Sequence, residues 1–295
     1  MVTPFKRIGL FAKYNSHTIA DTLEKLITLL LNRHHSLTIE AESAKLLSKK
    51  IPPVVTKEQL GQSCDLIIVV GGDGSLLNAA RAIAPYRVPI LGINRGRLGF
   101  LADILPDEME KELTAILEGQ FIKESRFLLQ AKLQRENKVI AETMALNDIV
   151  LYSGNISRMI DFEVYVNQHF VLRQQADGLI TATPTGSTAY ALSAGGPILY
   201  PTLNAITLAP LCPHTLSSRP IVVQGDSKIK LVITGIKKTY PKLSSDGQQH
   251  FDLIQHDQIL IEKYEHELIL IHPAHHDYYT VLREKLGWNI TPIKE

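Results

Sequence analysis

Residues 65–80 constrain the fold of this chain more than any other stretch. Leu66–Val70 is an unbroken apolar run, and such a run is typical of a strand covered on both faces of a parallel sheet. A glycine-rich turn follows at once, and residues 75–81 continue with a helix-forming composition. Strand, tight turn and helix in this order predict a unit of a doubly wound sheet, with the turn at the carboxyl end of the strand.

The turn itself reads Gly71-Gly72-Asp73-Gly74. Glycines allow an anion to approach the backbone closely, and the N–H groups at a helix N-terminus attract phosphate. Asp73 opposes that attraction unless it binds a cation, takes a proton or accepts a hydrogen bond from a hydroxyl group. We therefore expect chemistry at Asp73. The alternative is an ordinary turn in which Asp73 only caps the helix.

Two well-known phosphate loops do not match this turn. It lacks the G-x-x-x-x-G-K-[ST] pattern of the P-loop and the G-x-G-x-x-G spacing of dinucleotide-binding folds. It resembles the Gly-Gly-Asp-Gly turn of a kinase superfamily that includes NAD kinases, phosphofructokinases and diacylglycerol or sphingosine kinases. The turn alone does not choose among these families.

Alternating strands and helices predict a doubly wound α/β domain over residues 1–120. One helix is marked by an apolar stripe at Leu23, Leu26, Ile27, Leu30 and Leu31. The expected strands and helices span residues 7–13, 21–31, 36–40, 65–70, 75–81, 88–93 and 107–117.

A second glycine-rich loop, residues 92–101, follows the next strand. Because the carboxyl ends of parallel strands meet at one edge of a sheet, the two loops should form a ligand cleft. Asn94, Arg95 and Arg97 are either ligands in that cleft or parts of a packed, solvated turn.

The sequence changes character after residue 120. Short strand-like segments replace the helices and predict a β-sandwich-like domain over residues 121–273. They span residues 127–134, 139–144, 159–166, 168–173, 205–209, 220–223, 228–234 and 257–263. Residues 277–286 look helical again, with Gly287 as a cap, so the chain from about residue 274 to 295 is expected to return to the first domain.

Composition excludes several classes of protein. Lys+Arg 31 against Asp+Glu 30 leave a net charge of +1, which offers no strong field to attract nucleic acid or an anionic membrane. Cys64 and Cys212 form no close pair, and no apolar run approaches the ~18 residues of a membrane helix. We expect a cytoplasmic protein without nucleic-acid or membrane partners.

The eleven histidines do not follow the spacing of a metal site. His34-His35 lies at a helix end, and His272, His275 and His276 lack the pairing with a carboxylate that characterises H-E-x-x-H. We therefore predict no metal held by the protein's own side chains.

Residues 177–197 form the most distinctive segment. It opens with Asp177-Gly178, continues with Thr-Pro-Thr-Gly-Ser-Thr-Ala-Tyr at 183–190, and predicts a strand, a turn and a short helix. The hydroxyl groups of Ser187, Thr188 and Tyr190 would bind a polar ligand, and a planar base would stack on Tyr190. The alternative is a hydrogen-bonded turn without a ligand.

Three further segments accompany these motifs: Leu146-Asn-Asp-Ile149, residues 211–216 with Arg219–Val223, and Ser245-Asp-Gly-Gln248. Together with the Gly-Gly-Asp-Gly turn and the loop at 92–101, they make the chain similar to bacterial-type NAD kinases between residues 65 and 248. The string at 183–190 separates it from lipid kinases and phosphofructokinases.

The resemblance implies an activity. NAD kinases phosphorylate the 2′-hydroxyl of the adenosine ribose of NAD with ATP, giving NADP, on two-domain subunits that form homodimers or homotetramers. The resemblance implies that Asp73 takes the proton from the attacking hydroxyl or orients it, and that Gly71, Gly72 and Gly74 admit the triphosphate. A divalent ion, Mg²⁺, would be held mainly by phosphates and water.

The resemblance also implies the residues that contact NAD. Asn147 and Asp148 would hydrogen-bond the adenosine side, and Asp177 the nicotinamide half. The other implied contacts are Asp73, Gly74, Asn78, Arg158 near the diphosphate, Gln175, Thr188, Ala189 and Tyr190 around the adenine, Ser193 and Gln248. From the residues alone, Asn147-Asp148 is equally a turn, Asp246-Gly247 a hairpin signal and Arg158 a solvated side chain.

The chain departs from the family pattern at two of these positions. Many relatives carry arginine or histidine where this chain has Gln175, and a basic residue or histidine where it has Asn78. Glutamine offers hydrogen bonds without Coulomb attraction, so this pattern does not fix the choice between NAD and NADH.

Two other functions compete with an NAD kinase. A lipid kinase of the diacylglycerol or sphingosine type would share the turn, a β-rich second domain and a similar base. A non-catalytic nucleotide-binding sensor would keep the site without turnover. Asp73 argues against the sensor, because a mere binder gains nothing from a carboxylate that faces phosphate.

Overall fold

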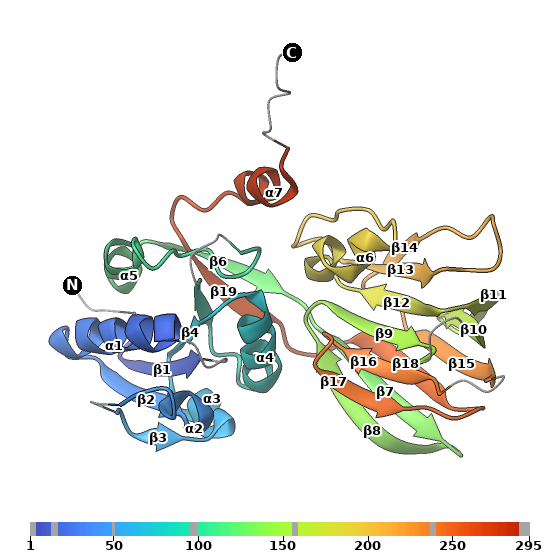
Figure 1. The fold of residues 1–295 in the computed structure, drawn as a ribbon, viewed down its shortest axis with the longest axis horizontal. Coiled ribbons are helices and arrows are strands. Elements are labelled where there is room, and N and C mark those ends of the chain that lie inside the picture. The colour runs from blue at the N-terminus through green and yellow to red at the C-terminus, as the bar shows by residue number, and fades with distance from the viewer. Residues whose placement is uncertain are drawn as a thin grey trace, which may run out of the picture. The chain divides into compact units, whose positions relative to one another are not determined.

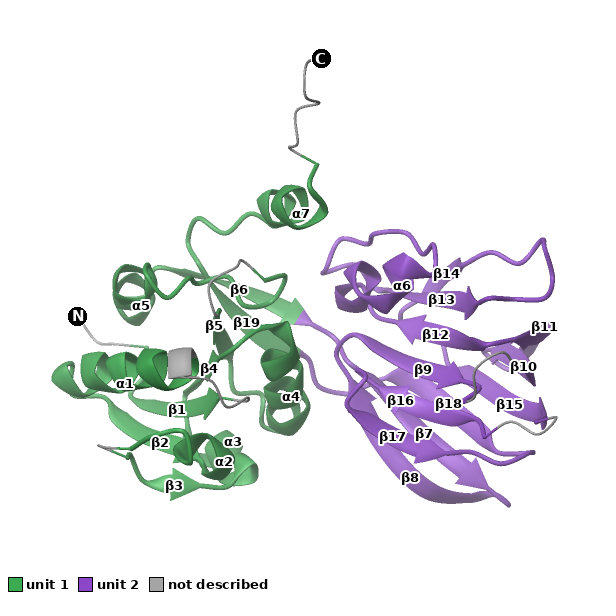
Figure 2. Ribbon diagram, in the orientation of Figure 1, with its two compact units in different colours: residues 1–125, 268–295 green, residues 126–267 purple. Residues whose placement is uncertain are grey.

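The computed structural model describes residues 4–12, 17–48, 51–94, 99–154, 159–236 and 240–288, and the chain divides into two compact units (Figure 2). The first unit comprises residues 1–125 and 268–295, and the second comprises residues 126–267. Each unit has a hydrophobic core of its own. The predicted fold class, an α/β part together with an all-β part, is confirmed.

The first unit is built on a sheet whose strands lie in the order β3-β2-β1-β4-β5-β19-β6 (Figure 1). From β3 to β19 each neighbouring pair is parallel. Every residue of the central strand β4 is buried, as the unbroken apolar run predicts. The strands are β1 Arg7–Ala12, β2 Ser36–Glu40, β3 Val54–Val55, β4 Leu66–Val70, β5 Ile90–Ile93, β6 Phe121–Arg126 and β19 Leu268–Pro273.

Helices cover this sheet, and α1 and α4 both contact β4. The stripe of α1 packs into the core through Leu23, Leu26, Ile27 and Leu30, whereas Leu31 is 45% exposed. The predicted cap Gly287 ends α7 in the left-handed conformation, with φ 69°. The helices are α1 His17–Asn32, α2 Ala41–Ala44, α3 Lys57–Ser63, α4 Asp73–Ile83, the 3-10 helix η1 Ala84–Tyr86, α5 Met109–Leu117 and α7 Tyr278–Leu286.

Strand β19 was not among the strands expected from the sequence. It follows the whole second unit in the chain, yet it lies between β5 and β6 in the sheet of the first unit. Leu270 pairs with Ile90 and Ile271 with Leu91. The side chains of Leu270 and Ile271 are each 1% exposed. The sheet of the first unit is therefore completed by residues from the far end of the sequence.

The second unit contains two antiparallel sheets, in the orders β11-β10-β15-β18-β7-β8 and β14-β13-β12-β9-β16-β17. Burial alternates along β7, β10 and β15, as it does when one face of a sheet packs against a core. The strands are β7 Leu129–Arg135, β8 Lys138–Ala145, β9 Asp148–Tyr152, β10 Ile160–Val166, β11 His169–Ala176, β12 Gly178–Ala182, β13 Ala205–Leu211, β14 Ile221–Gln224, β15 Ile229–Gly235, β16 Lys242–Ser245, β17 Gln249–Asp252 and β18 Gln258–Lys263.

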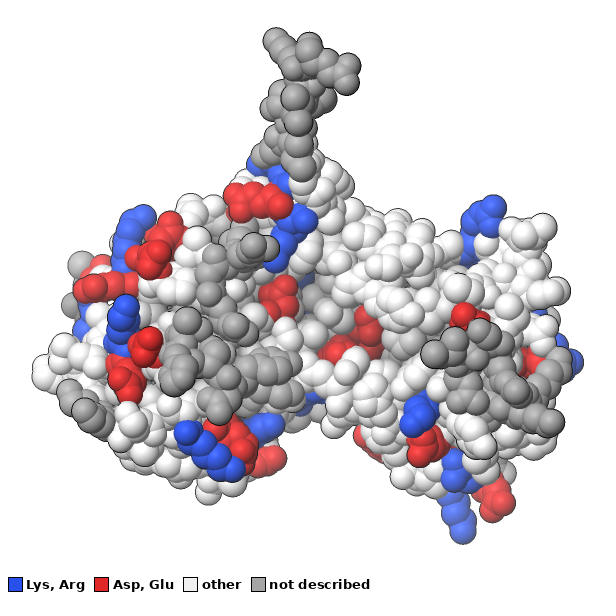
Figure 3. Space-filling view, viewed as in Figure 1, with Lys and Arg blue, Asp and Glu red and all other residues white. Residues whose placement is uncertain are grey.

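The surface carries both signs of charge. Figure 3 shows Lys and Arg side chains interspersed with Asp and Glu on the face in view, in keeping with the net charge of +1. Among the helices that the structure describes, none combines the length and apolar character needed to cross a membrane.

Candidate active site

The glycine-rich turn joins β4 to α4 as the sequence predicts. Gly71 has φ 154°, which L side chains rarely adopt, and its N–H donates to the Ile93 carbonyl at 2.9 Å. Gly72 is the N-cap of α4. A Cβ placed on Gly72 would meet no atom within 4 Å, so packing does not require glycine there. Half-buried Gly74 lies in the first turn of the helix, where N–H groups favour an anion.

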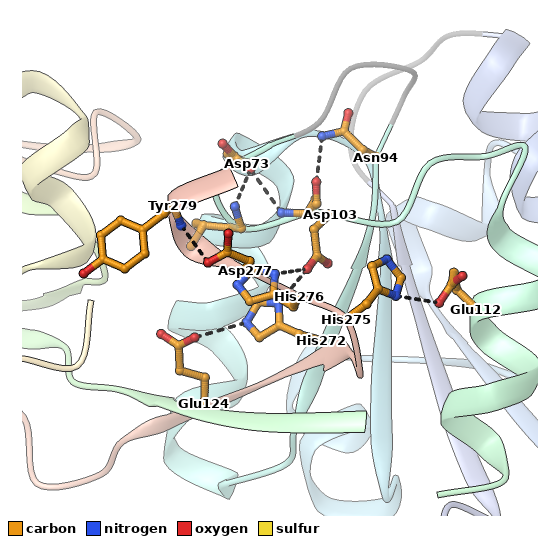
Figure 4. Close-up of polar contacts among 12 residues, drawn as sticks. Asp73, Asn94, Asp103, Glu112, Glu124, His272, His275, His276, Asp277 and Tyr279 are labelled. Atoms are coloured by element: carbon orange, nitrogen blue, oxygen red, sulfur yellow. Dashed lines mark hydrogen bonds and ion pairs between the residues drawn. The ribbon is translucent and has the colours of Figure 1, made fainter. Parts of the chain in front are cut away.

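The carboxylate of Asp73 is held by a neighbouring segment of the chain. Asp73 Oδ2 accepts the Phe100 N–H at 3.0 Å. Oδ1 accepts the N–H groups of Leu101 at 3.0 Å and Ala102 at 3.2 Å, and Figure 4 shows the Asp73 side chain. Asp73 is the first residue of α4 and not its N-cap. The alternative in which Asp73 only caps the helix is therefore wrong.

The second glycine-rich loop supports this arrangement. A Cβ on Gly99 would overlap Asp73 Oδ1 and would lie 2.8 Å from Asn94 Nδ2. Asn94 is 6% exposed and donates through Nδ2 to the Ala102 carbonyl at 2.9 Å. Asn94, one of the loop residues considered as ligands, therefore uses its side chain to hold the loop backbone. The other two, Arg95 and Arg97, lie outside the described residues.

Asn78 lies on α4, one turn beyond Asp73. Its Oδ1 accepts a hydrogen bond from Lys57 Nζ at 3.1 Å. A positive charge therefore stands beside position 78, although the residue at that position is neutral. Lys57 was not identified from the sequence, because it comes from α3, distant in the chain from the turn.

The second unit contains a cavity of ≈ 500 Å³, within the ~300–1,000 Å³ typical of small-molecule sites. It brings together four of the residues expected to contact NAD, which come from two distant segments: Asn147, Asp148, Ala189 and Tyr190. The other residues that line it are Val150, Tyr152, Ser244, Asp246, Gly247 and His250. Tyr152 and His250, which the sequence did not single out, are joined by a hydrogen bond between the hydroxyl and Nδ1 at 3.2 Å.

The turn at 146–148 is locked by Asp246. Asp246 and Gly247, at φ 49° and 63°, form the turn between β16 and β17, so the hairpin interpretation of this pair is right. The Asp246 carboxylate accepts the N–H groups of Leu146 at 3.1 Å, Asn147 at 2.8 Å and Asp148 at 3.2 Å. Two motifs that lie about a hundred residues apart are thus one structural unit.

Asp148 is electrostatically unusual. Its side chain is buried, and this burial, together with the nearby charge of Asp246, raises the pKa of Asp148 to about 7. Near neutral pH its carboxyl group is therefore divided between a protonated form that donates a hydrogen bond and an ionised form that only accepts.

The string at 183–190 forms the 3-10 helix η2 Thr185–Thr188 and leads into α6 Tyr190–Ser193. Ser187 is fully buried and its hydroxyl both donates to the Pro184 carbonyl at 2.6 Å and accepts the Leu199 N–H at 2.9 Å. Ser187 is therefore structural. A Cβ on Gly186 would overlap the Asn147 carbonyl, which explains glycine there and ties this string to the 146–148 turn.

The other expected contacts do not line this cavity within the described part of the chain. Thr188 donates to the Thr185 carbonyl at 3.3 Å, and Gln175 Nε2 donates to Asp161 Oδ1 at 3.1 Å. The backbone of Asp177 bonds Leu211 and Ser153, each at 2.9 Å. Ser193 ends α6, and Gln248 is the last residue of the hairpin turn. Arg158 lies outside the described residues.

Comparison with known proteins decides the family. The sequence model of the ATP-NAD kinase N-terminal domain matches residues 8–121, and that of the ATP-NAD kinase C-terminal domain matches residues 146–273. The chain belongs to the ATP-NAD kinase family. The resemblance inferred from the motifs is therefore confirmed, and the family is one of phosphotransferases.

Individual NAD kinases match along almost the whole chain. The NAD kinases of Pseudomonas entomophila (strain L48) and of Azotobacter vinelandii (strain DJ) are each 51% identical to it over 284 residues, 96% of either chain. The crystal structure of yeast NADH kinase complexed with NADH has a TM-score of 0.89 at 26% identity, covering 99% of this chain and 91% of that one. An NAD kinase from Archaeoglobus fulgidus in complex with ATP gives 0.71 at 28% identity, covering 95% and 97%.

Proposed function

We propose that this protein transfers the γ-phosphoryl group of ATP to the 2′-hydroxyl of the adenosine ribose of NAD, giving NADP. The relatives named NAD kinase support NAD as acceptor, and the similar structures were solved with NADH and with ATP. One observation carries the proposal. Asp73 is the first residue of α4, and its carboxylate is fixed by the backbone N–H groups of residues 100–102. A family match to NAD kinases also favours this acceptor over a lipid hydroxyl.

In this proposal the Asp73 carboxylate accepts a hydrogen bond from the ribose 2′-hydroxyl. A carboxylate offers about four lone-pair positions, and three are already used by N–H groups. The remaining one accepts the hydroxyl and aligns its oxygen with the γ-phosphorus. The new bond joins O2′ to phosphorus, the bond from phosphorus to the β,γ-bridging oxygen breaks, and the hydroxyl proton leaves toward Asp73.

The phosphates lie against Gly71, Gly72 and Gly74 in this proposal. The open space at Gly72 and the N–H groups of the first turn of α4 suit a triphosphate. Both oxygens of Asp73 already accept hydrogen bonds, which fits Mg²⁺ carried by the nucleotide and coordinated mainly by phosphate oxygens and water. When bound, the ion supplies charge neutralisation for the transferred group.

The cavity in the second unit suits the adenosine of NAD. Tyr190 is 50% exposed and offers a ring on which adenine stacks, while Asn147 and Asp148 offer paired donors and acceptors. We retain Asp177, Gln175, Thr188, Ser193, Gln248 and Arg158 as proposed further contacts. We also propose that the enzyme works in the cytoplasm as a homodimer or homotetramer.

The experiment is an assay of the purified protein with ATP and Mg²⁺ and with NAD, NADH or diacylglycerol as acceptor. NADP is detected with an NADP-specific dehydrogenase, and lipid phosphate by chromatography. We expect NADP formation and no lipid phosphorylation. Lipid phosphate without NADP, or nucleotide binding without turnover, would contradict the proposal.

A further inference from the structure

Three side chains from distant parts of the sequence meet inside the first unit. Asp103 follows the segment that holds Asp73, His272 lies on β19, and His276 lies in the turn before α7 (Figure 4). Asp103 Oδ2 is 2.8 Å from Nδ1 of His272 and 2.7 Å from Nδ1 of His276. The side chains of Asp103, His272 and His276 are 6, 0 and 8% exposed.

Within the described residues, this cluster leaves polar atoms without hydrogen-bond partners. They are Asp103 Oδ1, His272 Nε2 and His276 Nε2, all buried. Burying such atoms costs free energy that an apolar cluster of the same size would not cost. The two imidazole rings are also stacked, with centroids 4.0 Å apart and planes inclined by 20°. The arrangement costs stability, which suggests a use other than packing.

We propose that Asp103, His272 and His276 form a binding site for a divalent transition-metal ion of the Zn²⁺ class. One ligand atom from each of the three residues lies within 4.8 Å of the other two. Tetrahedral Zn²⁺ with bonds of ~2.1 Å places its ligand atoms roughly 3.4 Å apart, so the two histidines need to withdraw only slightly from the shared oxygen.

The chemistry of the ligands selects this class of metal. Two imidazoles and one carboxylate suit Zn²⁺, Ni²⁺ or Cu²⁺, whereas Mg²⁺ prefers oxygen ligands and water. Both imidazole Nδ1 atoms already face the same Asp103 oxygen, at 2.8 and 2.7 Å, so the three ligand groups converge on one point.

The surroundings supply an outer carboxylate. Glu124 Oε2 lies 3.9 Å from His272 Nε2. When Nδ1 of His272 binds the metal, its proton moves to Nε2 and faces Glu124. A carboxylate in that position orients a metal-bound histidine in many metalloproteins.

The proposed ion joins three pieces of the first unit. It would connect β19 and the turn before α7 to Asp103, directly after the N–H groups of residues 100–102 that hold Asp73. The local sequence spacing did not predict this site, because Asp103 and His272 are 169 positions apart.

The test uses the full-length protein, stripped with a chelator and free of nucleotide. Zn²⁺ uptake is measured by equilibrium dialysis with elemental analysis, and Co²⁺ serves as an optical probe of the coordination. We expect one tight Zn²⁺ per chain, a melting temperature raised by Zn²⁺ and not by millimolar Mg²⁺, and a Co²⁺ spectrum of a four-coordinate site. A chain that takes up no Zn²⁺ at micromolar concentration would overturn the proposal.

Adjacent histidines give matched variants. His276→Asn should weaken Zn²⁺ binding by more than the ~10–100-fold typical of losing an outer-shell partner. His275→Asn should leave binding unchanged, because His275 is 72% exposed and faces Glu112. His276→Cys should retain the metal, because a thiolate is also a Zn²⁺ ligand. If His276→Asn folds poorly, Zn²⁺ binding by His276→Cys still tests whether position 276 supplies a ligand. Equal Zn²⁺ affinity in His275→Asn and His276→Asn would show that Zn²⁺ binds to surface histidines and would overturn the proposed site.

Discussion

At the scale of single residues, the two glycine-rich loops use glycine for different reasons. Gly99 is required because a Cβ at this position would overlap Asp73 Oδ1 and crowd Asn94 Nδ2. Gly72 has φ −85° and open space at the Cβ position, so an L side chain is compatible with the folded backbone. Glycine at position 99 gives the Asp73 carboxylate its space, and in the proposed function the open space at Gly72 takes phosphate.

Two alanine substitutions separate these roles. Gly72→Ala should keep its melting temperature but raise the KM for ATP, because the methyl group enters the space assigned to the triphosphate. Gly99→Ala should lower both the melting temperature and kcat, because its methyl group displaces Asp73. Thermal melts and steady-state kinetics on both variants measure this, and identical behaviour of the two would contradict the assignment.

Asp148 predicts a pH dependence of stability. Its native pKa of about 7 lies above the ordinary value of 3.8, so between these values the native state binds more protons than the unfolded state. The free energy of unfolding should therefore fall as the pH rises from about 4 to about 7. Urea unfolding of the wild type and of Asp148→Asn across this range measures the effect. An unchanged slope in Asp148→Asn would show that another group titrates.

At the scale of elements, the β16–β17 hairpin and the 146–148 turn act as one unit through Asp246. The hairpin signal of Asp246-Gly247 was readable from the sequence because a tight turn between adjacent strands is local. Its partner was not readable, because hydrogen bonds between segments this far apart depend on how the strands pair. The same limit applies to Lys57 beside Asn78 and to His250 beside Tyr152.

Removal of Asp246 should loosen this unit. Asp246→Ala leaves three N–H groups without their carboxylate and should lower the free energy of unfolding by more than about 2 kcal/mol. NAD affinity should fall as well. Asp252→Ala is the matched control, because Asp252 lies at the end of the same hairpin and its side chain is 85% exposed. Equal effects of the two substitutions in urea unfolding and NAD titration would show that the Asp246 hydrogen bonds do not stabilise the 146–148 turn.

At the scale of the whole molecule, the first unit is not continuous in the sequence: it comprises residues 1–125 and 268–295, and the second unit lies between them in the chain. Apolar runs and periodicity predicted the α/β class, the β-rich second part and the returning helix α7, because those signals are local. They did not predict β19, and residues 268–273 were not among the expected strands. Its place between β5 and β6 comes from tertiary packing.

Substitution in β19 should weaken the first unit selectively. Leu270 is 1% exposed, and Leu270→Ala should cost about 2–5 kcal/mol. Hydrogen exchange should show faster exchange in β1 and β4, with β10 and β15 protected as before. Leu31→Ala, at an exposed position of the same unit, provides the control. Equal loss of protection in both units would show that they unfold together.

The most direct test of the account is the single-turnover rate of NADP formation in Asp73→Asn, measured with saturating ATP, Mg²⁺ and NAD. Asparagine keeps the size of the side chain but cannot take the hydroxyl proton. The account predicts a rate lower by ~10²–10⁴-fold with little change in the dissociation constant of NAD. A rate equal to that of the wild type would contradict the central role of Asp73.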